Sequence, residues 1–206
     1  MEIFKFKKNN QGGFALLISL IVVGVVISVG LSILDLSITQ VRLSYNAKQS
    51  EIAFNAANAG VECGRYWRRA LSAGDEMLAG APFVDDGGNS PECFEVEAEA
   101  VSVITLDSLA GEISGFGDAH VYDYQFSWGD TVARCTRITT LVIDSDPATT
   151  GVVVNNPTDW IPGFPENDIN CEGGSNCTVM AVRGYNQSCD NLSNFGTTER
   201  EVLLQF

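Results

Sequence analysis

The sequence has 206 residues and a formal net charge of −14 at neutral pH. A surface this acidic repels phosphate backbones, which argues against nucleic acid as a ligand of the surface as a whole. The length leaves room for one ordinary soluble domain with a core of its own, behind an apolar N-terminal segment.

The apolar segment, residues 14–34, contains no charged residue. At about 1.5 Å per residue a helix of this length reaches roughly 30 Å, the hydrocarbon thickness of a bilayer. It is longer than the apolar part of a secretory signal, and no small-residue cleavage site follows it. We therefore predict a transmembrane helix. Lys5, Lys7 and Lys8 precede it, so the positive-inside rule places the N-terminus in the cytoplasm and the rest of the chain outside.

Small residues recur every fourth position within this segment, at Gly24, Ser28 and Ser32. This spacing puts them on one face of a helix, where small side chains let a second helix approach closely in lipid. The alternative is that glycine and serine are simply common in membrane helices. The stripe is a candidate helix-packing face.

Helical periodicity continues past Asp35, and no proline interrupts it. One apolar stripe comprises Leu34, Ile38, Val41, Tyr45, Ile52, Ala56, Ala59 and Cys63. The pattern predicts that the helix runs to about Trp67, with residues 35–70 as its amphipathic continuation outside the membrane. Alanines at residues 53–59 suggest close packing of this part against a sheet.

Three arginines, Arg65, Arg68 and Arg69, lie close together near the predicted end of the helix. They could form a local basic patch. The simpler interpretation is that they interact favourably with the helix dipole and pair with nearby acids.

Residues 71–206 are predicted to form a β-rich domain outside the membrane. Residues 72–91 are rich in turn-forming and acidic residues and form the predicted connection to it. The strand candidates are residues 94–106, 120–128, 131–143, 151–154, 177–185 and 200–206, with a hairpin signal at Gly129-Asp130. The expected fold class is α+β: a long N-terminal transmembrane and amphipathic helix packed on a mostly antiparallel sheet. Residues 155–176 are expected to be a surface loop and a candidate contact surface, or else an insertion whose Trp160 and Phe164 fold back on the sheet.

Six cysteines follow the apolar segment: Cys63, Cys93, Cys135, Cys171, Cys177 and Cys189. An even number outside the cytoplasm predicts up to three disulfides, although six cysteines allow fifteen pairings. We expect local closure between Cys171 and Cys177, and Cys63 joined to Cys93. A zinc site is the less favoured alternative, because the chain has one histidine and no C-x-x-C pair.

The motifs of common enzymes are missing from the sequence. The only histidine, His120, has no G-x-S-x-G motif near it, and we expect it at the surface or at the end of a strand. Asp144, Asp146, Asp159, Glu166 and Asp168 are oxygen donors for a calcium ion, but they lack the spacing of an EF-hand loop. We expect no catalytic residue, no cofactor and no metal, and a secreted hydrolase is the least favoured class of function.

The N-terminal sequence KKNNQGG followed by FALLISLIVVGVV resembles the leader and start of a type IV pilin precursor. The resemblance implies that residues 1–13 are a cytoplasmic leader. A prepilin peptidase would cut between Gly13 and Phe14 and methylate the new N-terminus.

Major pilins have glutamate as the fifth residue after the cleavage site, where it pairs with the amino terminus of a neighbouring subunit; this chain has Ile18. Some minor pilins also lack this glutamate, notably the PilX type. The sequence VRLSYNAKQSEIAFNAANAGVE, with Arg42 and the alanine-rich residues 53–62, resembles the N-terminal module of that type. The chain is thus similar to PilX-like minor pilins and pseudopilins over residues 7–67.

The resemblance implies assembly into a type IV pilus or a type II secretion filament, in priming or at the tip. The implied partners are other pilin subunits, a prepilin peptidase, the inner-membrane assembly platform and membrane lipid. The implied location is the inner membrane, with a cytoplasmic N-terminus, and then a filament at the cell surface. The rival hypothesis is a single-pass membrane-anchored protein that binds or adheres to a ligand outside the cell and never polymerises.

Overall fold

The computed structural model describes residues 12–72, 91–129 and 133–206. It contains one long apolar helix, α1 (Gly12–Ser72), followed by antiparallel strands, so the predicted α+β fold is confirmed. The helix is continuous as expected, because no proline removes a backbone donor along it. The chain divides into two compact units, Met1–Ala47 and Lys48–Phe206.

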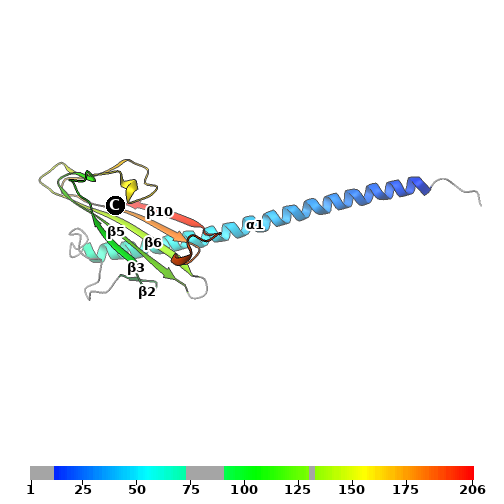
Figure 1. Ribbon diagram of the computed structural model, residues 1–206, viewed down its shortest axis with the longest axis horizontal. Helices are drawn as coiled ribbons and strands as arrows, with labels where there is room; N and C mark the ends of the chain where they lie inside the picture. Colours follow the sequence, from blue (N-terminus) through cyan, green and yellow to red (C-terminus); the bar gives the residue numbers. More distant parts are fainter. Residues whose placement is uncertain (1–11, 73–90, 130–132) are drawn as a thin grey trace, which may run out of the picture. The chain divides into compact units, whose positions relative to one another are not determined.

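The second unit is built on a five-stranded antiparallel sheet with the order β10-β9-β6-β5-β3 (Figure 1). Its strands are β3 (Glu99–Thr105), β5 (Gly117–Trp128), β6 (Arg134–Ser145), β9 (Asn176–Tyr185) and β10 (Glu199–Gln205). The two longest strands, β5 and β6, pair along their whole length. Aromatic residues alternate along β5, and Tyr122, Tyr124 and Phe126 are fully or almost fully buried on the side of the helix.

Two smaller sheets also lie in the described part of the second unit. One is three-stranded, with the order β4-β7-β8, and the other is a pair, β1-β2. Their strands are β1 (Glu92–Cys93), β2 (Val96–Glu97), β4 (Ile113–Gly115), β7 (Gly151–Asn155) and β8 (Asp168–Glu172); two short 3-10 helices are η1 (Pro157–Asp159) and η2 (Cys189–Asn191).

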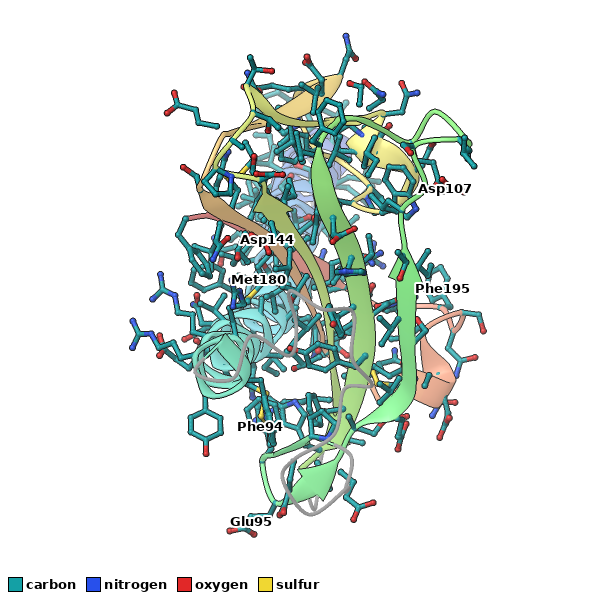
Figure 2. All side chains as sticks on the ribbon, turned by 90° about the vertical axis from the view of Figure 1, so that its left-hand side faces the viewer. Phe94, Glu95, Asp107, Asp144, Met180 and Phe195 are labelled. Carbon is teal, nitrogen blue, oxygen red and sulfur yellow. A yellow bond between two sulfur atoms is a disulfide. The ribbon has the colours of Figure 1, made fainter. Side chains whose placement is uncertain are left out.

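Small residues line the face of α1 that packs on the five-stranded sheet. Ala53, Ala56 and Ala57 are fully buried there. A Cβ added to Gly184 of β9 would overlap the helix backbone at Ala53 O and Ala57 N. The helix and the strand therefore touch backbone to backbone. Figure 2, a view from the end of the unit, shows Met180 of β9 beside the helix.

The predicted apolar stripe of the helix was only partly right. Ala56 and Cys63 are buried and Ile52 and Ala59 are half-buried, but the first four members, which lie before Lys48, are exposed. The stripe also omitted Gly60 and Gly64, although a Cβ at either would press on side chains of the sheet. Glycine carries no hydrophobic signal, so periodicity alone did not identify these two close contacts with the sheet.

Two hydrophobic cores lie in the second unit. The first lies between α1 and the five-stranded sheet and includes Trp67, Tyr124, Phe126, Ile138 and Met180. The second joins the five-stranded sheet to the three-stranded one. Its members include Leu141, Ile143, Val152, Val154, Ile161, Phe164, Ile169 and Val179.

The expectation for residues 155–176 was wrong in part. This segment contains η1 and β8, and β8 pairs with β7. Ile161, Phe164 and Ile169 are buried in the second core, and Trp160 packs against it. The alternative interpretation, in which the aromatic residues fold back on the sheet, is the correct one for this stretch. Polar and apolar residues alternate over only five positions in Asp168–Glu172. Burial of this segment depends on its pairing with β7, which the local sequence does not reveal.

The other strand predictions agree with the structure in position, with differences at their ends. The expected strand 94–106 starts later and is divided into β2 and β3 at Ala98. Phe94 and Glu95 have positive φ angles and form the turn between β1 and β2, and Ala100, which also has a positive φ angle, lies at a register shift within β3. β4 was not predicted. The predicted connection 72–91 lies almost entirely outside the described residues, as do residues 1–11 of the predicted leader and Asp130 of the hairpin signal.

Candidate functional site

The first candidate site is the apolar part of α1. All side chains from residue 14 to residue 47 are exposed, and large apolar ones such as Phe14, Leu20 and Val26 are each more than 60% exposed. Within the described residues, α1 is the one helix long and apolar enough to cross a membrane. Apolar side chains that none of the described residues covers are unstable in water and require lipid or another protein surface. The chain therefore carries a single-pass membrane anchor near its N-terminus.

The stripe of small residues lies within this anchor. The hydroxyl of Ser28 donates to Val25 O at 2.9 Å, and that of Ser32 donates to Ser28 O at 2.9 Å. Both donors are thus satisfied inside the helix, which removes the main penalty for placing a hydroxyl in lipid. A Cβ at Gly24 would have no atom outside the helix's own turns within 4 Å. Geometrically, this face can accept a second helix at short range.

The predicted cleavage site lies at the N-terminal end of α1. Gly13 and Phe14 are in the first turn of the helix, which begins at Gly12. Ile18, the position at which major pilins carry glutamate, is 45% exposed. Residues 14–34 contain no charge to pair with an incoming amino terminus.

All six cysteines form disulfides: Cys63–Cys93, Cys135–Cys189 and Cys171–Cys177. The two expected pairs are confirmed, and the zinc alternative is excluded for these residues because none of the thiols is free. Each bridge joins different elements. Cys63 ties α1 to β1, Cys135 ties β6 to η2, and Cys171 ties β8 of the smaller sheet to β9 of the larger one.

The bridge to β1 is supported by an aromatic cluster. Phe94, labelled in Figure 2, stacks on Trp128 with ring centroids 4.6 Å apart and meets Phe126 edge to face at 5.7 Å. Arg134 lies 5.3 Å above the Trp128 ring, within the range of a cation–π contact. The Trp67 indole donates to Glu92 O at 3.3 Å. These contacts hold the β1-β2 pair against the helix and close the first core at that end.

Two of the three clustered arginines, Arg65 and Arg68, have different surroundings. Arg65 forms an exposed salt bridge with Glu62 at 3.8 Å, which contributes little to stability. Arg68 is 7% exposed and its Nε donates to Thr178 Oγ1 at 2.9 Å. A buried guanidinium bound to the sheet is not part of a basic patch, so the interpretation that favoured local pairing is the better one.

The expected position of His120 was wrong. The residue is 5% exposed and lies within β5, where its Nδ1 is 3.1 Å from Thr105 Oγ1. The candidate calcium ligands do not converge either. Among the described residues, no three histidine, cysteine, aspartate or glutamate side chains gather closely enough to hold a metal ion.

Sequence reasoning missed a polar cluster on the face of the large sheet opposite the helix. It consists of Asp123 from β5, Arg137 and Thr139 from β6, and Arg183 from β9. These side chains meet because the register pairs Asp123 with Thr139, and Arg137 with Arg183. Charged residues at alternate positions of otherwise apolar strands were the signal that could have indicated it.

No family model, curated protein or solved structure matches this chain.

Proposed function

We propose that this chain is a pilin-like subunit of the minor, PilX-like type, which joins a type IV pilus or a type II secretion-like filament. The observation that supports the proposal is the continuity of α1. One unbroken helix provides an exposed apolar segment and then, from Ala53 onward, a face buried in the core of the β-rich unit. A protein that needs only an anchor requires no such continuity, because a flexible linker serves equally well.

The proposed mechanism is an exchange of partners by the apolar part of α1. Before assembly its side chains contact membrane lipid, and in the filament they contact the helices of other pilin subunits. The face formed by Gly24, Ser28 and Ser32 would be a point of closest approach. A prepilin peptidase and the inner-membrane assembly platform are the partners of the earlier steps, and the cytoplasmic N-terminus is the end on which the peptidase acts. The final location is the cell surface.

Ile18 favours a subunit that is used rarely. An isoleucine cannot form the ion pair that would align each incoming subunit, so a role in priming or at the tip fits better than a role as the bulk subunit. The β-rich unit, which is rich in acidic residues, would then face outward, where its three disulfides are compatible with an oxidising environment.

The second candidate function is a membrane-anchored binding protein that does not polymerise. It is favoured by one observation, a pocket on the sheet face opposite the helix that is lined by Asp123, Arg137, Trp160 and Arg183. Binding and assembly are compatible in one protein. Processing at Gly13 separates the two candidates.

The test is the N-terminal residue and mass of the membrane-extracted protein, expressed with and without a prepilin peptidase. The proposal expects a chain that begins at N-methylated Phe14 only when the peptidase is present. A Gly13→Leu variant should retain the longer precursor, whereas Gly12→Ala, one residue from the scissile bond, should still be cut. An intact Met1 start under both conditions would refute the pilin-like function and leave the anchored binding protein.

A further inference from the structure

A pocket of about 270 Å³ opens on the face of the large sheet that α1 does not cover. Strands β3, β5, β6 and β9 form its floor, and the segment after η1 forms one side. The volume lies just below the usual range for small-molecule sites, so it suits one compact ligand such as a single sugar ring.

The polar wall of the pocket is organised around Asp123. Arg137 forms a salt bridge with this carboxylate through Nε and Nη2, and Thr139 Oγ1 donates to its Oδ1 at 3.3 Å. The pair leaves Asp123 with its charge compensated and its acceptors in use. Consistent with this arrangement, the hydrogen bond to Asp123 is the main reason that the pKa of Arg137 is raised.

Arg183 differs from Arg137 because its guanidinium N–H groups form no salt bridge with a carboxylate in the described part of the chain. Its Nη2 donates to Thr139 Oγ1 over a long 3.4 Å, and its buried Nε has no hydrogen-bond partner in the described part of the chain. Glu201 lies opposite Arg183 in the register; burial raises the pKa of Glu201, and the nearby charge of Arg183 opposes that rise. The described residues include no salt bridge between the two. A guanidinium has five N–H donors in a fixed plane, which match a carboxylate in a bidentate arrangement.

The side of the pocket formed by η1 and the residues after it carries Trp160 and Pro162, and Asp159 adds a carboxylate to it. Trp160 packs partly against the second core and lines the pocket with the rest of its surface. The pocket therefore presents an aromatic surface beside hydroxyl groups and charged groups of both signs. A sugar ring suits such a lining, because its C–H face is apolar and its hydroxyl groups lie around the edge.

We propose that this pocket binds one acidic saccharide unit, with the ring against Trp160 and the carboxylate on Arg183. Ser102 and Thr139 add hydroxyl groups to the lining of the same pocket. The inference concerns the β-rich unit alone and holds whether or not the chain joins a filament, so its failure is separate from failure of the processing experiment.

The test uses the full chain in a zwitterionic detergent without a sugar headgroup. Saturation-transfer NMR and calorimetry measure binding of D-glucuronate, D-glucose and acetate. We expect glucuronate to bind at least about tenfold more tightly than glucose or acetate. Glucose has no carboxylate to pair with Arg183, and acetate has no ring to contact Trp160. Saturation transfer should be strongest for ring C–H protons and should fall in Trp160→Ala.

Arg183→Gln should weaken glucuronate binding about tenfold or more and leave the weak binding of glucose unchanged. Arg200→Gln is the matched control, because Arg200 lies on the neighbouring strand, is exposed and donates to Ser50 of the helix, outside the pocket. Thermal unfolding confirms that both variants are folded. Equal binding of glucuronate and glucose, equal binding of acetate and glucuronate, no saturable binding, or an equal effect of the two arginine variants would each overturn the proposal.

Discussion

Replacing Gly184 with alanine tests the backbone contact between α1 and β9. A Cβ at this position would overlap Ala53 O and Ala57 N and lie 2.9 Å from Ala56 C. Helix backbone atoms cannot rotate away as a side chain does, so the helix and strand must separate. Overpacking a dense core costs about 1–3 kcal/mol. We expect about 3 kcal/mol, the upper end of that range, because both clashes are with backbone.

Gly64→Ala is the matched control, since it adds the same methyl group at the same interface. The nearest atoms there are Met180 Sδ at 2.6 Å and Cε at 3.0 Å. A methionine side chain is flexible and can move aside. Alanine is also more favourable than glycine within a helix by about 1 kcal/mol. The two effects oppose each other, so the unfolding free energy of this variant should stay within about 1 kcal/mol of the parent.

The assay is thermal unfolding of the full chain in detergent, with disulfides intact, followed by near-ultraviolet circular dichroism. For a unit of this size each 1 kcal/mol shifts the melting temperature by about 2–4 °C, so Gly184→Ala should melt roughly 6–12 °C lower. Gly64→Ala should remain within about 4 °C of the parent. Melting temperatures for the two variants within about 2 °C of each other would refute the inferred backbone contact.

Two further predictions concern the same unit. Removing Cys63–Cys93 with two serines should lower the unfolding free energy by up to about 3.6 kcal/mol, and removing Cys171–Cys177 by up to about 2.2 kcal/mol, since they close loops with separations of 30 and 6 residues. Urea titration measures both, and a larger loss for the shorter loop would contradict the estimate. Burial raises the pKa of Tyr124 and Tyr185. Above about pH 10 the unfolded chain releases tyrosine protons that the folded chain keeps, so stability should fall as pH rises. Urea titrations at about pH 9 and about pH 11 should show this fall in the free energy of unfolding. The fall should be smaller in Tyr124→Phe and the same in Tyr66→Phe, whose ring is exposed. A free energy of unfolding that does not change between these pH values would contradict the prediction.

Local patterns in the sequence were enough to predict the helix, most strands and the shortest disulfide. An uninterrupted apolar segment and the absence of proline define α1 within a few residues, because helix formation depends on neighbours three and four positions apart. Alternation of aromatic residues predicted the strand that became β5, because successive side chains of a strand point to opposite faces. Cys171 and Cys177 are close in the chain, so their pairing needed little tertiary information.

Tertiary structure alone decided the burial of β8, the contact at Gly184 and the pocket. β8 forms a strand because it pairs with β7 and packs its apolar side chains in the second core. The pattern of its own five residues is too weak to predict a strand. The pocket joins Asp123, Arg137 and Arg183, which come from three strands and meet only in one register. A shift of one residue would turn these side chains to the other face. Register depends on the packing of whole strands, and no local segment contains that information.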